Sequence, residues 1–266
     1  MRLEGNEGCL YMMGNNIIKT YLELCYNRQT KCCLDMYLPS LRGFKTIVYF
    51  HGGGLEAGDK ADKNYVEIAK RFAECGYGFV SVNYRMYPTA KFPEYLEDAA
   101  EAIAWVKTHI QEYDGNGELY VSGQSAGAWI SLMLCLNKEY LNAVGISPME
   151  IKGWIIDSAQ TTSHFNVLKR ETGSDPSLQR IDKYAPLYYV DKDTRLTKML
   201  ILFYEEDMPC RPEQNMLFIK ALKNFNENTD IQYKQLLGGH CCGSTVKDDD
   251  GEYAFVKETL RWLEKC

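Results

Sequence analysis

Short apolar segments alternate with stretches of helical periodicity along most of this chain, and that alternation constrains the fold more than any other feature of the sequence. The segment 46–50 is a continuous apolar run, typical of a strand that is buried on both faces of a sheet. Further strands are predicted at 78–84, 118–122, 153–158, 199–204 and 231–237, and helices at 65–75, 93–111, 126–136, 212–225 and 252–264. Strands that alternate with helices predict an α/β fold, a doubly wound and mostly parallel sheet flanked by helices.

Two segments near the N-terminus follow a different rule. Residues 20–26 and 31–38 alternate partly between apolar and polar side chains around a turn at 27–29, which predicts an antiparallel hairpin at a sheet edge. The sequence contains no internal repeat, linker or low-complexity tract. We therefore expect residues 1–266 to form a single domain, which is long enough to bury a sizeable core.

The charge balance limits the possible partners. A net charge of −6 provides no basic face for phosphates, so nucleic acid is not an expected partner. No stretch approaches the ~18 consecutive apolar residues that a bilayer-spanning helix needs, so no membrane span is expected. Residues 1–7 carry acidic side chains where a signal peptide has a basic and then an apolar run, which favours the cytoplasm.

Ten cysteines invite a disulfide or zinc interpretation, but their spacing supports neither. Cys32-Cys33 and Cys241-Cys242 are adjacent pairs, and no Cys-x-x-Cys occurs. A chain of this length also has core enough to fold without disulfides. We expect reduced thiols that behave mostly as small apolar side chains, and no metal site.

The segment Gly123-Gln124-Ser125-Ala126-Gly127 lies between a predicted strand and a predicted helix. A Gly-x-Ser-x-Gly turn in this setting exposes its serine hydroxyl, and the crowded backbone favours glycine two residues to either side. The amides at the start of the following helix favour developing negative charge nearby. Ser125 is therefore the candidate nucleophile.

A glycine-rich loop follows the buried strand that ends at Phe50, with the sequence His51-Gly52-Gly53-Gly54. Glycines let a backbone approach a substrate closely and turn its N–H groups toward it. The amides of Gly53 and Gly54, together with that of Ala126, are the candidate oxyanion hole for a tetrahedral intermediate.

The candidate base and acid follow by elimination. Of the four histidines, His51 precedes the glycine loop, His109 is within a predicted helix and His164 lies in an irregular segment. His240 follows the last predicted strand, at a carboxyl end where parallel sheets place their chemistry, so it is the candidate base.

Three carboxylates, Glu205, Glu206 and Asp207, follow the strand that ends at Tyr204. Asp207 fits the role of the triad acid best because it opens the turn toward Pro209, and Glu206 is its main rival.

These motifs in the chain order Ser125, Asp207, His240 resemble the α/β-hydrolase superfamily and, more narrowly, its hormone-sensitive-lipase-like branch of small esterases. The loop 51–60 is similar to that of esterases related to bacterial feruloyl and acetylxylan esterases and to kynurenine formamidase. Asn83-Tyr84-Arg85 and the segment from Phe92-Pro93 to Trp105-Val106 also match that group. The resemblance runs from about residue 45 to the C-terminus and is strongest over 46–136.

One departure from the group is Leu55, where many relatives carry an aromatic residue, which affects the expected acyl pocket. The segment at about 160–197 stands where these enzymes insert a small lid, and it matches no particular relative.

The residues and the resemblance together imply a serine carboxylesterase that forms an acyl-serine intermediate on short-chain esters and needs no cofactor. An amide-cleaving hydrolase of the same fold, such as a formamidase or peptidase, stays open because one triad serves both bonds. A non-catalytic ligand-binding module and a thiol-based redox protein using Cys210, Cys241 and Cys242 are the alternatives from other classes. The sequence leaves the oligomeric state open.

Overall fold

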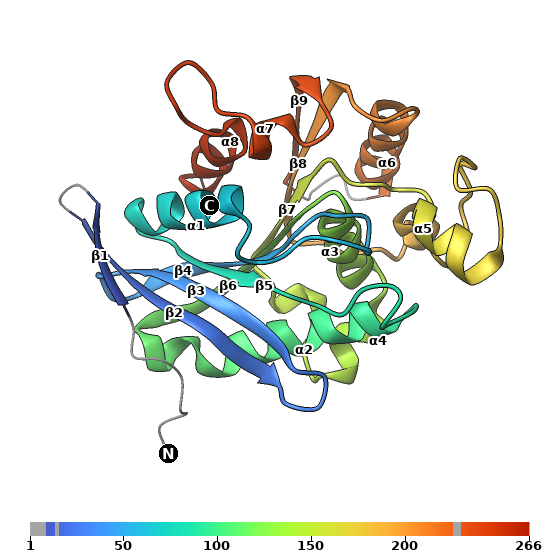
Figure 1. Cartoon of the computed structure of the whole chain (residues 1–266). Coiled ribbons are helices and arrows are strands. Elements are labelled where there is room, and N and C mark those ends of the chain that lie inside the picture. Colours follow the sequence, from blue (N-terminus) through green and yellow to red (C-terminus); the bar gives the residue numbers. More distant parts are fainter. Residues whose placement is uncertain (1–8, 14–15, 226–229, 266) are drawn as a thin grey trace.

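One β-sheet runs through the computed structural model, which describes residues 9–13, 16–225 and 230–265 (Figure 1). Within those residues the sheet has nine strands in the order β1-β2-β3-β5-β4-β6-β7-β8-β9. Their bounds are β1 Cys9–Met13, β2 Asn16–Asn27, β3 Cys32–Pro39, β4 Phe44–Phe50, β5 Gly78–Val82, β6 Gly115–Gln124, β7 Gly153–Asp157, β8 Lys198–Glu206 and β9 Ile231–Gly239.

Pairing in the sheet is antiparallel from β1 to β5 and parallel from β5 to β9. The expected fold class, a mostly parallel doubly wound sheet, is confirmed. The predicted hairpin forms from β2 and β3, but it does not lie at the sheet edge, because β1 pairs outside β2. Sequence reasoning missed β1, which has only five residues.

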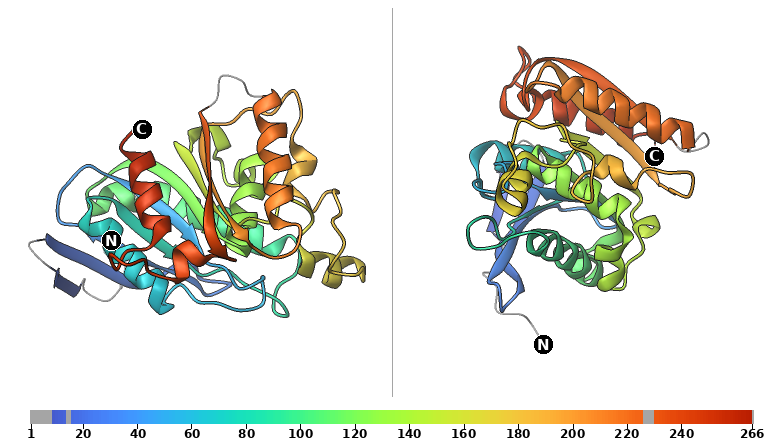
Figure 2. Two further views of the ribbon diagram at one scale, coloured as in Figure 1. Left: turned by 90° about the horizontal axis from the view of Figure 1, so that it is seen from above. Right: turned by 90° about the vertical axis from the view of Figure 1, so that its right-hand side faces the viewer.

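Helices cover both faces of the sheet. One face carries α1 (Lys63–Glu74) and α8 (Ala254–Leu263), while the other carries α2 (Glu94–His109), α3 (Ala126–Leu136) and α6 (Arg211–Phe225) (Figures 1 and 2). Because side chains alternate along a strand, β4 supplies Val48 and Phe50 to one core and Ile47 and Tyr49 to the other. This two-sided burial is why the segment is apolar throughout.

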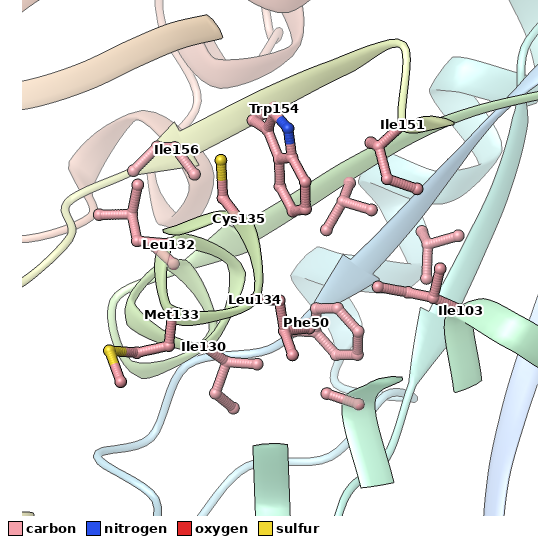
Figure 3. Close-up of a cluster of buried hydrophobic side chains, with 14 of the residues drawn as sticks. Phe50, Ile103, Ile130, Leu132, Met133, Leu134, Cys135, Ile151, Trp154 and Ile156 are labelled. Carbon is pink, nitrogen blue, oxygen red and sulfur yellow. The ribbon is translucent and has the colours of Figure 1, made fainter. Parts of the chain in front are cut away.

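Helix α3 is buried along its whole length, as its almost wholly apolar sequence requires. Its side chains pack against β4, β7 and α2 in the core cluster drawn in Figure 3, which includes Phe50, Ile103 and Trp154. The predicted helix at 126–136 is confirmed at both ends. A helix held on all sides gives the turn that precedes it a rigid support.

Segments without long elements connect the rest of the chain. Residues 160–197 contain only the short turns α5 (Phe165–Val167), Leu168–Thr172 and Pro186–Tyr189. Two further short helices, α4 (Lys138–Ala143) and α7 (Cys242–Thr245), were not predicted. Among the described residues, no helix combines the length and the apolar character that crossing a membrane requires.

Candidate active site

Ser125 occupies the sharp turn between β6 and α3. Its backbone has φ 52° and ψ −111°, a conformation that residues other than glycine rarely adopt. A Cβ atom on Gly123 would lie 2.3 Å from the carbonyl carbon of Gly127, and one on Gly127 would lie 2.0 Å from the Phe50 carbonyl oxygen. The amide of Ser125 donates to the Asp157 carbonyl oxygen at 2.8 Å. Both glycines are therefore needed for close backbone approach around an exposed serine.

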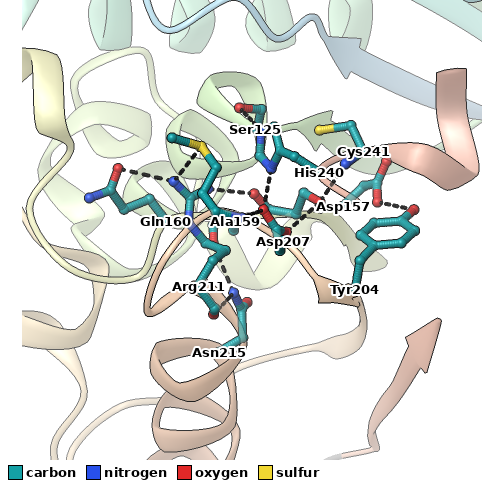
Figure 4. A network of polar contacts seen from close by, with 12 residues as sticks. Ser125, Asp157, Ala159, Gln160, Tyr204, Asp207, Arg211, Asn215, His240 and Cys241 are labelled. Carbon is teal, nitrogen blue, oxygen red and sulfur yellow. Dashed lines mark hydrogen bonds and ion pairs between the residues drawn. The ribbon is translucent and has the colours of Figure 1, made fainter. Parts of the chain in front are cut away.

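The three residues predicted as nucleophile, base and acid lie together, although they are far apart in the sequence (Figure 4). His240 Nε2 lies 2.8 Å from Ser125 Oγ, and His240 Nδ1 lies 2.5 Å from Asp207 Oδ1. The side chain of Asp207 is fully buried, whereas that of His240 is 28% exposed. A histidine held between a buried carboxylate and a serine hydroxyl is suited to taking the proton of that hydroxyl.

Asp207 keeps its negative charge despite its burial. Burial by itself raises the pKa of this carboxyl, but the hydrogen bond and charge of His240, with further help from the Met208 amide and the Arg211 charge, bring the pKa below its usual value. The Met208 amide donates to Asp207 Oδ1 at 2.6 Å, and Ser158 Oγ donates to Oδ2 at 3.0 Å. An ionised Asp207 can hold the Nδ1–H tautomer of His240 in place.

The rival carboxylates lie elsewhere. Glu205 and Glu206 are exposed at the end of β8, and neither makes a hydrogen bond to a histidine in the described structure. The other histidines are engaged outside this constellation: His51 Nδ1 lies 2.7 Å from the Gly52 carbonyl oxygen, and His109 stacks on Trp105.

His164 is buried, and its Nδ1 accepts from the Asn166 amide. Burial lowers the pKa of this imidazole to about 3, so the ring is neutral at physiological pH.

The glycine loop lies directly beside the serine turn. A Cβ atom on Gly52 would lie 3.4 Å from Ser125 Cβ, and one on Gly53 would lie 1.9 Å from the Ala57 carbonyl oxygen. Gly53 and Gly54 have φ of 106° and 65°, in the region that favours glycine. Among the described residues, neither of their amides donates to a protein acceptor. Free amides next to a serine hydroxyl are suited to binding an oxyanion.

Sequence reasoning missed Ser158 and Arg211, which support Asp207 and the loop of His240 through hydrogen bonds. The Arg211 guanidinium donates to the Ser158 carbonyl oxygen at 2.9 Å, and the Ser158 hydroxyl accepts from the Cys241 amide at 3.1 Å. The signal for Ser158 was its place directly after a predicted strand, where parallel sheets gather functional side chains. Arg211 carried no comparable signal, because it begins a helix.

The cysteines near the constellation differ in accessibility. Cys210 is exposed, Cys242 is half-buried and Cys241 is buried, and burial raises the pKa of the Cys241 thiol. No cysteine with a described side chain forms a disulfide. Among the residues that the structure describes, no cluster of three or more His, Cys, Asp or Glu side chains is arranged to hold a metal ion.

Comparison with known proteins finds that this chain is similar to esterases. The BD-FAE family model matches residues 34–153. A probable isoprenylcysteine alpha-carbonyl methylesterase of Oryza sativa subsp. japonica is 35% identical over 116 residues, covering 42% of this chain and 27% of that protein. The probable carboxylic ester hydrolase LipM of Mycobacterium tuberculosis is 35% identical over 86 residues, which are 32% of this chain and 20% of LipM.

Similarity of fold extends much further than similarity of sequence. The esterase Est2 of Thermogutta terrifontis superposes with a TM-score of 0.71 over 90% of this chain and 89% of its own, at 20% sequence identity. By contrast, the matched stretch of this chain spans only about a quarter or less of the length of the two curated relatives. The solved structure therefore shows a shared fold, and the family model covers the part of the sheet within residues 34–153.

Proposed function

Because the chain belongs to the α/β-hydrolase superfamily, in its hormone-sensitive-lipase-like group, we propose that it is a serine carboxylesterase acting on small esters with a short acyl group. The observation that carries the proposal is the hydrogen-bonded series Asp207, His240 and Ser125, with 2.5 Å and 2.8 Å between the paired atoms. A serine hydroxyl is a weak nucleophile, and a hydrogen-bonded imidazole activates it.

In the proposed reaction, Ser125 Oγ attacks the acyl carbonyl carbon while its proton passes to His240 Nε2. Asp207 holds the imidazole in the correct tautomer and stabilises the imidazolium that forms. The imidazolium then protonates the leaving alcohol, which leaves an acyl-serine. Water hydrolyses that ester in a second step, with His240 again accepting a proton.

The oxyanion of each tetrahedral intermediate is assigned to the amides of Gly53, Gly54 and Ala126. Two observations support this assignment. The glycine amides have no protein acceptor among the described residues, and the Ala126 amide begins the buried helix α3. Amides that are already oriented stabilise the developing charge without reorganising during the reaction.

The preference for a short acyl group rests on the segment at 160–197, assigned as a small lid over the glycine loop. Asn166 Nδ2 donates to the Gly54 carbonyl oxygen at 2.6 Å, and a Cβ atom on Gly54 would lie 3.3 Å from the Phe165 ring. Arg170 pairs with Glu56 of the same loop at 2.5 Å. These contacts hold the segment close to the site and favour small substrates.

The first prediction tests the nucleophile. Ser125→Ala is expected to lower kcat on p-nitrophenyl acetate by about 10⁶-fold while the protein stays folded, because the triad acts as a unit. Ser122→Ala is the control for removing a nearby hydroxyl, since Ser122 is buried in β6 and its hydroxyl makes no hydrogen bond among the described residues. A serine-directed phosphonate is expected to label Ser125 alone in the parent protein.

Activity of Ser125→Ala within tenfold of the parent would overturn the assignment. The same assay is repeated with p-nitrophenyl esters whose acyl chains run from acetate to octanoate, and with the corresponding anilides. Faster cleavage of the anilides than of the esters would identify an amide, in place of an ester, as the substrate. Absence of turnover and of labelling in the parent protein would indicate a ligand-binding module.

A further inference from the structure

A continuous series of buried hydrogen bonds joins three of the loops that carry the proposed catalytic groups, namely the glycine loop, the Ser125 turn and the segment after His240. The Gly52 amide donates to Tyr65 Oη at 3.3 Å, and the Tyr65 hydroxyl donates to Gln124 Oε1 at 2.5 Å. Gln124 Nε2 donates to Ser244 Oγ at 2.6 Å, and the Ser244 hydroxyl donates to Asp157 Oδ2 at 2.6 Å. The series thus begins in the glycine loop and ends at a carboxylate on the central sheet.

Every donor in this series points toward Asp157. An ionised carboxylate accepts hydrogen bonds and donates none, so it sets the direction of the Ser244 hydroxyl and, through it, of each earlier member. Tyr204 donates to the other oxygen, Asp157 Oδ1, at 2.8 Å (Figure 4). Hydrogen bonds that share one direction polarise and strengthen one another in a dry interior.

The members come from four separate parts of the fold. Tyr65 lies on α1, Gln124 directly precedes Ser125, Ser244 follows His240 on α7, and Asp157 ends β7. All four side chains are buried, and no described cation pairs with Asp157 within ion-pair distance. Burial raises the pKa of this carboxyl to about 6, so holding it ionised at neutral pH costs free energy.

We propose that Tyr65, Gln124, Ser244 and Asp157 are positioning residues that hold the glycine loop in register with Ser125 and His240. The bond from the Gly52 amide to Tyr65 holds the residue directly before Gly53 and Gly54, whose amides are assigned to the oxyanion. This inference rests on the proposed esterase function for its catalytic consequence, but the hydrogen bonds themselves can be tested separately.

The test uses two single-hydroxyl deletions in the full chain. Tyr65→Phe removes the hydroxyl that joins Gly52 to Gln124, and it is expected to lower kcat about 10-fold with KM changed less than twofold, because the interaction matters in the transition state. Tyr49→Phe is the matched control: Tyr49 is equally buried, its ring lies 5.5 Å from that of Tyr65, and its hydroxyl makes no hydrogen bond. The control is expected to keep kcat within twofold.

Hydrogen–deuterium exchange of a peptide that spans residues 47–59, so that it begins well before Gly52, gives a readout that does not depend on turnover. Tyr65→Phe is expected to accelerate exchange of the Gly52 amide at least fivefold, because that amide loses its acceptor, and Tyr49→Phe is expected to leave it unchanged. Unchanged exchange in Tyr65→Phe overturns the inference whether or not the protein is an esterase. Faster exchange with unaltered kcat in an active enzyme overturns the positioning role.

Ser244→Ala completes the test from the other end of the series. If Tyr65 and Ser244 act through one network, the double variant is expected to lose no more kcat than the worse of the two single variants. Strictly multiplicative losses would show independent effects and contradict the proposal. An inactive parent protein that still shows the exchange effect would overturn the esterase proposal and leave the network standing.

Discussion

Non-glycine residues with positive φ gather in the loops at the carboxyl ends of the parallel strands. Each of five such loops contains one: Leu55 after β4, Ser125 after β6, Ser158 after β7, Cys210 after β8 and Cys241 after β9. A left-handed conformation costs such a residue roughly 1–2 kcal/mol, so the surrounding structure must hold it in place. Three of these residues, Ser125, Ser158 and Cys241, make hydrogen bonds within the candidate site.

The assignment of Asp207 as the triad acid can be tested by substituting single carboxylates. Asp207→Asn is expected to lower kcat about 10⁴-fold with little change in KM, because the amide cannot stabilise the imidazolium of His240. Glu206→Gln, at the exposed neighbouring position, is expected to change kcat less than threefold. Both variants are measured by steady-state hydrolysis of p-nitrophenyl acetate, and the reverse order would assign the acid to Glu206.

Among the elements, the contact between α3 and β4 decides where the serine turn sits. The backbone of Gly127 lies very close to the carbonyl groups of Phe50 and His51. A Cβ atom on Gly127 would lie 2.0 Å from the Phe50 carbonyl oxygen and 2.6 Å from the His51 carbonyl oxygen. The same two strand-end residues lead into the glycine loop. One close backbone contact therefore sets the spacing between the nucleophile and the proposed oxyanion donors.

This contact predicts an asymmetry between two glycine substitutions. Gly127→Ala is expected to destabilise the protein by about 3 kcal/mol or more, because α3 must move away from β4. A Cβ atom on Gly145 would meet no atom within 4 Å, so the only unfavourable effect of Gly145→Ala is the backbone φ of 76°. A destabilisation of about 1 kcal/mol is expected. Urea denaturation compares the two, and equal losses would contradict the close contact.

Across the whole molecule, strand order accounts for the convergence of the candidate site. Strands β6, β7, β8 and β9 are consecutive both in the chain and in the sheet, and all are parallel. Their carboxyl ends therefore lie side by side and present Ser125, Asp157, Asp207 and His240 on one edge. The two buried carboxyls there have pKa values shifted in opposite directions, downward for Asp207 and upward for Asp157.

The raised pKa of Asp157 makes a prediction about the stability of the fold. Between pH 4 and 6 the folded protein binds this proton more tightly than the unfolded chain, so the contribution of Asp157 to stability falls as pH rises. Relative to Asp157→Asn, the free energy of unfolding of the parent protein is expected to fall by about 3 kcal/mol between pH 4 and 6. Above pH 6 the difference between the two proteins is expected to stay constant.

Urea denaturation of both proteins from pH 4 to 8 measures this difference, and the subtraction cancels the opposite contribution of Asp207. A difference in unfolding free energy that stays constant with pH would contradict the raised pKa of Asp157.

Local constraints made much of the fold and site predictable. The apolar run at 46–50 needs burial on two faces, the segment 126–136 has no polar side to expose, and the glycines around Ser125 are demanded by the turn itself. Each of these requirements acts within a few residues, so it can be read from a short stretch of sequence. The boundaries of α3 were inferred in this way, whereas Asp207 and His240 were assigned by elimination from their places after predicted parallel strands.

Tertiary structure alone decided the contacts between elements that no local pattern links. Tyr65 lies on α1 and was predicted only as one apolar position of a helix, yet its hydroxyl joins Gly52 to Gln124. Arg211 and Ser158 likewise gain their roles from the packing of α6 against β8 and β9, which brings Arg211 to the residue that follows β7. Hydrogen-bond partners across 50 to 120 residues depend on how the two faces of the sheet are covered, which periodicity does not encode.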